Sequence, residues 1–180
     1  MDELKIVITG CVGSGKSTAI QSISDTDIIA TDVDASDEIK EDKDTTTVAL
    51  DYGELKTDDG QLIKIYGTPG QDRFSFMWEI LAEGALGIAV LVNHQRPDPV
   101  GDLDMYLANF RKAIEDSTVV VGITHLDDED MDGMDRYYDY MAARGLDYPI
   151  FPVDARSRFQ VNVMIEAMAA MISLDEEEYV

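Results

Sequence analysis

The chain has 180 residues, and its 37 Asp and Glu residues against 14 Lys and Arg residues give a formal net charge of −23 at pH 7. Such an excess of negative charge opposes binding to DNA, RNA and anionic lipid, so we expect no nucleic acid partner and no direct membrane anchor. Solubility or adaptation to salt is the simplest reason for the acidic composition, and a basic protein partner is the alternative.

The length predicts one domain that covers residues 1–180 and ends in a short acidic tail, residues 175–180. Cys11 is the only cysteine, which excludes an internal disulfide and favours a cytoplasmic location. No apolar run approaches the roughly 18 residues that a membrane span needs, and we expect neither a signal peptide nor a lipidation site.

Residues 10–17 read GCVGSGKS, which fits the pattern G-x-x-x-x-G-K-S, between an expected strand (residues 4–9) and an expected helix (residues 14–24). Small residues let backbone N–H groups converge on phosphate oxygens, and the helix directs its positive end toward them. Lys16 supplies a charge for the β- and γ-phosphates, and the Ser17 hydroxyl is the expected ligand of Mg²⁺. The residues predicted to bind the phosphates are Gly10, Gly13, Ser14, Gly15, Lys16, Ser17 and Thr18.

A polar, acid-rich stretch at residues 28–44 has no periodicity and is predicted to be a mobile loop. Strand patterns follow at residues 48–55 and 62–66, and the Asp59-Gly60 pair between them is a strong hairpin signal. We therefore expect these two strands to pair in antiparallel orientation.

The sequence GTPGQDRF at residues 67–74 interrupts the strand pattern, and a helix is expected over residues 74–83. Its apolar residues recur at helical spacing, which is more typical of a core-facing stripe than of a ligand site. This stripe consists of Phe74, Met77, Trp78 and Leu81.

Strands and helices alternate in the second half of the chain. A near-continuous apolar run at residues 84–92 is typical of a strand that is buried on both faces of a parallel sheet. Gly145 follows a predicted helix in the position of a C-cap. The other expected strands are 118–124 and 149–153, and the expected helices are 102–116, 134–144 and 159–173.

This order of elements predicts an α/β fold: a three-layer P-loop NTPase with a six-stranded, mostly parallel sheet and one antiparallel edge strand. In open sheets of this kind, ligands bind at the carboxyl ends of the strands. The phosphate loop and residues 67–71, 124–127 and 154–156 all follow expected strands. We therefore predict a single nucleotide site at one edge of the sheet.

The motifs resemble those of Ras-like small GTPases in order and spacing, over nearly the whole chain. They are the phosphate loop, TTTVALDY (45–52), TPGQDRF (68–74), THLD (124–127) and DAR (154–156). On these residues the chain is identified as a prokaryotic Ras-like small GTPase, with the Ras-like G domain as its fold. The Pro-Gly-Gln form of the second switch resembles the gliding-motility GTPase MglA and related proteins, which pair with roadblock-domain partners.

The resemblance implies GTP or GDP with Mg²⁺ as the bound cofactors and assigns catalytic roles to Lys16, Thr47 and Gln71. Thr47 corresponds to the switch I threonine that ligates Mg²⁺, although a threonine at a strand edge is the alternative. Gly70 corresponds to the glycine whose N–H touches the γ-phosphate, and Gln71 to the glutamine that orients the attacking water.

For the base, the resemblance implies that Asp127 accepts hydrogen bonds from the guanine ring N1–H and the exocyclic amine. Adenine offers neither donor, so a preference for guanine has a physical cause, although a solvated acid is the alternative. Ala155 corresponds to the residue whose N–H meets the guanine O6, and the Arg156 stem can pack on the base. Thr124 and His125 stand where the family has Asn and Lys.

Other departures concern the metal and the reaction rate. Gly67 replaces an aspartate that holds Mg²⁺ through water, and Val12 replaces a common glycine. Switch I lacks an arginine between residues 31 and 47, and Arg73 is the nearest candidate in the same chain. Since such an arginine contributes about 10³ to 10⁵ in rate, we expect slow intrinsic hydrolysis and an activating partner.

The expected function is a GTP-binding molecular switch in which residues 28–47 and 67–74 respond to the nucleotide. The expected partners are a GTPase-activating protein, of roadblock type by the resemblance, and an effector that binds the switch regions. A pseudo-GTPase that holds nucleotide without turnover is an alternative. A P-loop kinase of a small metabolite is a third hypothesis, which lacks the arginine cluster expected over a transferred phosphate.

Overall fold

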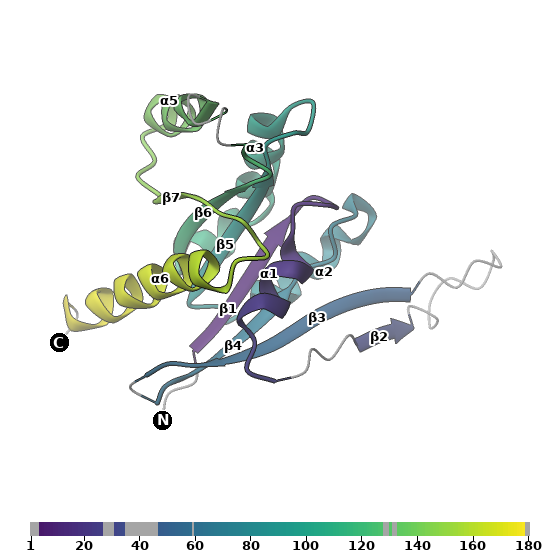
Figure 1. The fold of residues 1–180 in the computed structure, drawn as a ribbon, viewed down its shortest axis with the longest axis vertical. Coiled ribbons are helices and arrows are strands. Elements are labelled where there is room, and N and C mark those ends of the chain that lie inside the picture. Colours follow the sequence, from purple (N-terminus) through teal and green to yellow (C-terminus); the bar gives the residue numbers. More distant parts are fainter. Residues whose placement is uncertain are drawn as a thin grey trace.

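The computed structural model describes residues 4–26, 31–34, 47–58, 60–127, 130 and 133–178, with backbone alone for 31–34, 47–50 and 176–178. Strands and helices alternate along the chain (Figure 1). The elements are β1 (Leu4–Gly10), α1 (Lys16–Ile23), β2 (Thr31–Asp34), β3 (Thr47–Lys56), β4 (Leu62–Gly67), η1 (Asp72–Phe74), α2 (Ser75–Ala82), β5 (Gly87–Asn93), α3 (Pro99–Asn109), α4 (Arg111–Glu115), β6 (Thr118–Thr124), α5 (Asp135–Arg144), β7 (Ile150–Pro152) and α6 (Arg158–Glu178).

The strands form one sheet in the order β2-β3-β4-β1-β5-β6-β7. All neighbouring pairs are parallel except the two that involve β3, which runs antiparallel to both β2 and β4. The predicted α/β class, with a mostly parallel sheet and one antiparallel strand, is therefore confirmed.

The position of the antiparallel strand differs from the prediction. We expected six strands with the antiparallel one at the edge, but β2 adds a seventh strand outside β3. β2 lies within residues 28–44, which we expected to be a loop. Its sequence, TDVD, is short and acidic, so the pairing of its backbone with β3 leaves no hydrophobic pattern in the sequence.

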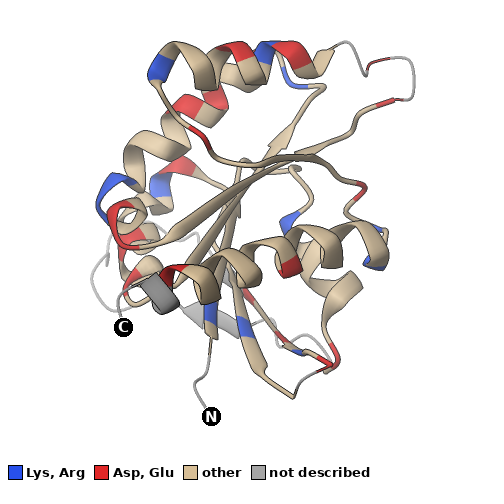
Figure 2. Cartoon of the chain, turned by 90° about the vertical axis from the view of Figure 1, so that its left-hand side faces the viewer, with Lys and Arg blue, Asp and Glu red and all other residues tan. Residues whose placement is uncertain are grey.

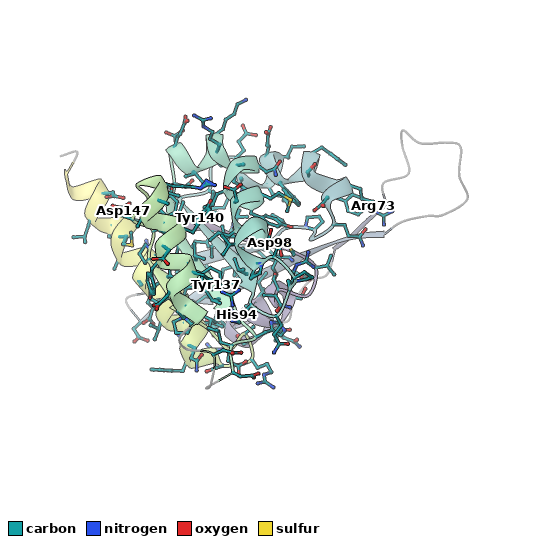
Figure 3. All side chains as sticks on the ribbon, turned by 90° about the horizontal axis from the view of Figure 1, so that it is seen from above. Arg73, His94, Asp98, Tyr137, Tyr140 and Asp147 are labelled. Carbon is teal, nitrogen blue, oxygen red and sulfur yellow. The ribbon has the colours of Figure 1, made fainter. Side chains whose placement is uncertain are left out.

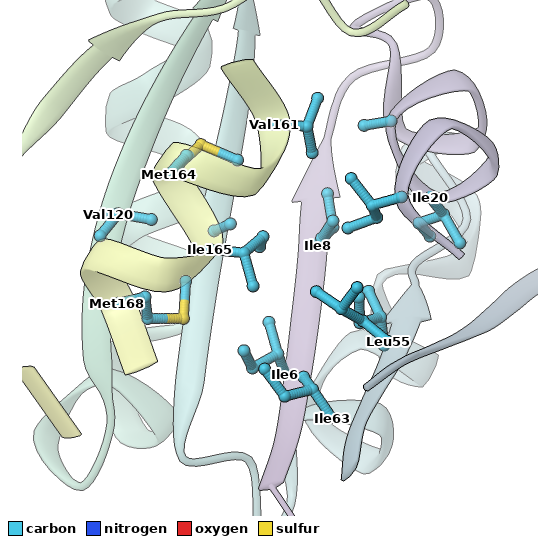
Figure 4. Close-up of a cluster of buried hydrophobic side chains, with 14 of the residues drawn as sticks. Ile6, Ile8, Ile20, Leu55, Ile63, Val120, Val161, Met164, Ile165 and Met168 are labelled. Atoms are coloured by element: carbon cyan, nitrogen blue, oxygen red, sulfur yellow. The ribbon is translucent and has the colours of Figure 1, made fainter. Parts of the chain in front are cut away.

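Two layers of helices cover the sheet. Helices α1 and α6 pack on one face, where apolar side chains of β1 fill the space between them (Figure 4). Helices α2, α3 and α5 pack on the other face around Trp78 and Tyr137. The central strand β5 alternates between the two cores, with Ala89 and Leu91 facing one and Ile88, Val90 and Val92 facing the other. This alternation explains why its sequence is apolar throughout.

The helix expected over residues 102–116 is instead two helices. α3 begins at Pro99, where Asp98 Oδ1 accepts a hydrogen bond from the Gly101 N–H at 2.9 Å. It ends before Phe110, whose ring is buried and stacks on Trp78 with 5.7 Å between ring centroids. α4 then continues from Arg111. The periodic apolar pattern runs across the break because both helices face the same core.

The remaining helices agree with the sequence patterns. Gly145 closes α5 in the left-handed conformation, with φ 64°, as its C-cap position predicts. α6 extends to Glu178, beyond the expected end near residue 173.

Acidic residues lie on helices and loops at several places around the sheet (Figure 2). No helix in the described part of the chain is long and apolar enough to cross a membrane.

Candidate functional site

The predicted motifs meet at one edge of the sheet, where the parallel strands β1, β4, β6 and β7 all end (Figure 1). Short bonds link the segments that follow these strands. The Thr68 N–H donates to the Ile8 carbonyl at 3.0 Å, and the buried hydroxyls of Thr9 and Thr68 lie 2.7 Å apart. These bonds join residues 67–74 to the base of the phosphate loop.

Glycines shape the phosphate loop. Gly10, Gly13 and Gly15 have positive φ angles of 148°, 77° and 97°. A β-carbon on Gly10 would lie 2.2 Å from the Leu91 carbonyl oxygen, so no side chain fits there. Gly15 is the N-cap of α1 and makes no side-chain capping bond, which leaves the first N–H groups of the helix for an anion. The loop therefore has the backbone that its spacing predicts.

Lys16 lies buried inside this loop. Its Nζ donates to the Gly10 carbonyl at 2.5 Å and to the Cys11 carbonyl at 2.8 Å. Burial lowers the pKa of Lys16 to about 8, and the nearby acidic groups Cys11 and Asp51 oppose this shift. The amine is thus held at the centre of the loop, where it can meet a phosphate.

Gly70 packs directly against the phosphate loop. A β-carbon on Gly70 would lie 2.7 Å from the Val12 nitrogen and 2.8 Å from Lys16 Nζ. Aromatic side chains of the helices hold this segment, since the Trp78 indole N–H donates to the Pro69 carbonyl at 2.8 Å and the Tyr106 hydroxyl to the Gly70 carbonyl at 3.4 Å. This geometry places Gly70 next to the phosphate loop, and its contact with a γ-phosphate stays a prediction.

Gln71 is exposed, next to Gly70. Its Oε1 accepts a hydrogen bond from Arg73 Nε at 2.7 Å, and the Arg73 guanidinium lies 4.8 Å from the centre of the Phe74 ring. The amide oxygen that would orient a water is therefore bonded to the arginine that we considered as a candidate in the same chain.

A cavity of about 750 Å³ opens beside the phosphate loop, between the segments that follow β6 and β7. It brings together all five residues predicted at the base, namely Thr124, His125, Asp127, Ala155 and Arg156. Its lining consists of Gly15, Thr18, Gln95, Thr124, His125, Leu126, Asp127, Pro152, Val153, Asp154, Ala155, Arg156 and Gln160.

Thr124 and His125 join β6 to the phosphate loop. The Thr124 hydroxyl donates to the Ser14 carbonyl at 2.8 Å, so a link to the loop persists where the resemblance predicts an asparagine amide. His125 Nδ1 lies 2.9 Å from the same hydroxyl. His125 is exposed and has φ 58°, and it is the one non-glycine residue with positive φ among the described residues.

Asp127 and Arg156 both line the cavity, and Arg156 is held in an ion pair. Asp127 is exposed after β6 and lines the cavity. Arg156 is paired with Asp154 through two bonds of 2.9 and 2.8 Å, which lower the pKa of Asp154 to about 2. Ala155 is buried against Gly15, at which a β-carbon would lie 2.9 Å from the Ala155 Cβ.

A histidine anchors α5 next to this cavity. His94 Nε2 accepts from the Arg136 guanidinium at 3.0 Å, so its Nδ1 carries the proton and donates to the Tyr137 hydroxyl at 2.8 Å (Figure 3). Burial, followed by the charge of Arg136, lowers the pKa of His94. These two bonds of His94 hold the start of α5, which follows the loop that carries Asp127.

Of the two predicted metal ligands, Ser17 and Thr47, only Ser17 has a described side chain. Ser17 Oγ donates to Asp51 Oδ2 on β3. Thr47 is the first residue of β3 and pairs with Asp34, but its side chain lies outside the described residues. Across the described ranges, no group of three or more His, Cys, Asp or Glu could hold a metal ion. The hard oxygens of Ser17 and Asp51 do suit Mg²⁺, which usually takes its other ligands from phosphates and water.

Several residues at the site were not predicted. Asn93 Nδ2 donates to the Gly13 carbonyl at 3.1 Å, and Gln160 Oε1 accepts from the Asp154 N–H at 2.7 Å. Asn93 ends a buried strand at the ligand edge, which is a usable sequence signal. Gln160 lies on a helix after the last motif, and nothing in its local sequence marks it.

Fold and loop together place the protein in the P-loop NTPase class. Residues 26–143 match the family described as "Conserved hypothetical ATP binding protein", and the chain belongs to this family. The matched region includes the segments at 67–74 and 124–127 and begins after the phosphate loop. Nucleotide binding is the property that the family description supports.

An archaeal protein resembles part of the chain. The uncharacterized protein MJ1339 of Methanocaldococcus jannaschii is 37% identical to it over 83 residues, which are 46% of this chain and 46% of that protein. The match thus spans about half the length of the relative.

Proposed function

We propose that the protein is a guanine-nucleotide switch that binds GTP or GDP with Mg²⁺ and hydrolyses GTP slowly. The observation that carries this proposal is the cavity beside the phosphate loop, into which Asp127 projects from the β6 loop. A carboxylate accepts hydrogen bonds and donates none, so it pairs with the two donors of the guanine edge and leaves adenine unpaired.

In this proposal the phosphates lie over α1. The Lys16 amine and the backbone N–H groups of residues 13–18 bind them, and the Ser17 hydroxyl would be a ligand of the Mg²⁺. The metal, when bound, neutralises phosphate charge. The close contact of Gly70 with Val12 and Lys16 supports a role in sensing the γ-phosphate, because a ligand at Lys16 must meet Gly70 as well.

Slow intrinsic hydrolysis follows from the surroundings of Gln71. An attacking water needs an acceptor for its proton, and Gln71 Oε1 is already bonded to Arg73. A partner that separates these two side chains, or that supplies its own arginine, would accelerate the reaction. Phe76 and Ile80 on α2 are 64% and 66% exposed and lie one helical turn apart, which provides an apolar surface for such a partner.

The test is calorimetric titration of nucleotide-free protein with GDP, GTP and ATP. We expect the protein to prefer guanine nucleotides and Asp127→Ala to remove about 10- to 100-fold of that preference, the cost of unpaired polar groups. Asp135→Ala, an exposed acid at the start of α5, is the matched control and should keep the preference.

Equal or tighter binding of ATP would overturn the guanine assignment, and the family description makes this the decisive comparison. Single-turnover hydrolysis of bound GTP, with and without a roadblock-domain protein, then separates a slow GTPase from a pseudo-GTPase. Tight GTP binding with no turnover in either condition identifies the latter.

A further inference from the structure

Gly67 ends β4 at the position where the resemblance predicts a metal-binding aspartate, and it has little room for a side chain. A β-carbon there would lie 2.8 Å from Ile20 Cδ1 and 3.1 Å from Asp51 Cβ. Distances near 3 Å force neighbouring atoms to move, so the side chains of Asp51 and Ile20 already occupy the space that a residue at 67 would use.

Asp51 is the residue directly opposite Gly67 in the antiparallel pair of β3 and β4. Directly opposite residues project their side chains from the same face of a sheet. The face is that of α1, because Leu55, four residues further along β3, belongs to the core under α1. The carboxylate of Asp51 therefore leaves the sheet on the side that an aspartate at 67 would use, one strand away.

The hydrogen bond between Ser17 and Asp51 has a defined direction. An ionised carboxylate only accepts, so the Ser17 hydroxyl must donate its single proton to Asp51 Oδ2. Both lone pairs of Ser17 Oγ then point away from that proton and are free for a cation. Partners of metal ligands commonly act in this way, by fixing the ligand's orientation and increasing its basicity.

The negative charge of Asp51 also acts on Lys16 in the phosphate loop. It raises the pKa of Lys16, against the larger lowering caused by burial. One carboxylate thus lies near both groups that face the phosphates, the lysine amine and the serine hydroxyl. A divalent cation placed at Ser17 would be attracted by that same negative charge.

We propose that Asp51 is the metal-site carboxylate of this protein and takes the place of the aspartate missing at Gly67. It orients the Ser17 hydroxyl toward the divalent cation and supplies the negative charge of the site from β3 instead of β4. This inference rests on the proposed function in one respect, namely that a nucleotide with its cation occupies the loop. With Asp51 in this role, the absence of an aspartate at position 67 does not imply weak metal binding.

A purely structural role for Asp51 makes a different prediction. If the carboxylate only tied β3 to α1, its loss would lower stability and leave the metal dependence of nucleotide binding unchanged. The two roles are separated by measuring metal affinity directly rather than turnover.

The experiment titrates Mn²⁺ into the protein–GDP complex and follows free Mn²⁺ by electron paramagnetic resonance. Asp51→Asn retains the shape and an acceptor for Ser17 but removes the charge. We expect Mn²⁺ affinity to fall about 10- to 100-fold, as for other partners of metal ligands. GDP affinity in EDTA, measured by calorimetry, should change much less. Unchanged Mn²⁺ affinity in Asp51→Asn would overturn the proposal.

Glu54→Gln is the matched control, because Glu54 is a carboxylate on the same strand that bonds the Tyr52 hydroxyl at 2.6 Å, and its odd offset from Asp51 places it on the other face. It should leave Mn²⁺ affinity as in the unmodified protein. An equal loss in Glu54→Gln would mean that overall charge, and not position, sets the affinity, and would also overturn the proposal.

A second variant protects the test if Asp51→Asn is too unstable to purify. Combining Asp51→Gly with Gly67→Asp moves the carboxylate to β4. Because the two positions lie directly opposite each other, the aspartate at 67 would use the space that the glycine at 51 leaves. Mn²⁺ affinity within about tenfold of the unmodified protein is expected, and a loss as large as that for Asp51→Gly alone would count against a positional role.

The outcome is independent of base specificity. If the unmodified protein binds ADP rather than GDP, the guanine proposal fails, and the Mn²⁺ titrations are run on the ADP complex. Asp51 is then judged by the same ratio between variant and unmodified protein.

Discussion

The phosphate end and the base end of the cavity are built in different ways. At the phosphate end, Ser14, Lys16 and Thr68 are buried. Lys16 Nζ donates to the Gly10 carbonyl, the Thr68 hydroxyl bonds to that of Thr9, and the Ser14 carbonyl accepts from the Thr124 hydroxyl. At the base end, Asp127 and Arg156 are exposed. Under the proposed function, recognition of phosphate would therefore be part of the fold, whereas the choice of base would depend on a few exposed side chains that can be substituted without loss of the fold.

The strongest test of this contrast is removal of the buried charge at the phosphate end. Lys16→Met should weaken GTP and ATP binding alike, by about 100-fold, because a charged hydrogen-bond donor at the phosphates is lost. The protein should still unfold cooperatively, since methionine fills the site without a desolvated charge. Calorimetric titration with both nucleotides measures the effect.

Lys5→Met is its control, because Lys5 lies at the other end of β1 and donates to the Glu83 carbonyl at 2.6 Å. Affinity within a factor of two of the unmodified protein is expected for this variant. A Lys16→Met protein that keeps its nucleotide affinity would show that the phosphates bind elsewhere.

Gly70→Ala tests the contact between residues 67–74 and the phosphate loop. The added β-carbon would meet the Val12 nitrogen at 2.7 Å and Lys16 Nζ at 2.8 Å, so the segment must move away from the loop. We expect the affinity ratio of GTP to GDP to fall about tenfold, within the range for overpacked sites. Asp72→Ala, in the exposed turn that follows, should leave the ratio unchanged, and an equal change there would argue against a contact specific to Gly70.

Titration of Lys16 should make the protein more stable as the pH rises, which is the opposite of a lysine that gains an acidic partner on folding. The pKa of folded Lys16 is lowered from 10.5 to about 8, so between these values the unfolded state binds more protons and the free energy of unfolding rises with pH. Nucleotide affinity should fall over the same interval, as the amine loses its charge. Urea unfolding and calorimetry across pH 8 measure both trends.

Lys16→Met supplies the reference for that experiment, because other groups also titrate in alkaline solution. The difference in unfolding free energy between unmodified protein and Lys16→Met should change with pH. A difference that stays constant across pH 8 would mean that Lys16 does not titrate there.

A smaller effect than that of Lys16→Met is expected at the base end, where His125 has a positive φ of 58°. Asn tolerates this conformation and β-branched residues do not. His125→Val should lower the free energy of unfolding by about 1 to 2 kcal/mol, and His125→Asn by less than half of that. Urea denaturation compares them, and equal losses would show that the backbone conformation does not limit residue choice.

The same contrast explains which parts of the site could be predicted from sequence. Gly13 and Gly15 have the positive φ angles that the loop spacing implies, because a strand, a glycine loop and a helix together fix the local backbone. Asp127 and Ala155 line the expected cavity because parallel strands end at a common edge.

Other features depend on tertiary contacts that no local pattern records. Trp78 was expected as a core residue, and its ring is buried beside that of Tyr106, but the polar ends of both side chains bond to the segment at 67–74. The role of Asp51 requires the register of β3 on β4. The hairpin signal alone does not give that register, because a two-residue turn at residues 59–60 would place residue 51 opposite residue 68, whereas Asp51 lies opposite Gly67. Only the structure shows the carboxylate at Ser17.

Trp78 has a further consequence, because it is the only tryptophan in the chain. Its indole N–H is bonded to the Pro69 carbonyl at 2.8 Å, and its ring stacks on Tyr106 with 4.7 Å between centroids. Indole emission is sensitive to that hydrogen bond and to the packing of the ring. The protein therefore contains its own optical reporter, attached to the segment that a nucleotide-driven rearrangement would displace, and its intrinsic fluorescence can follow such a change without a dye.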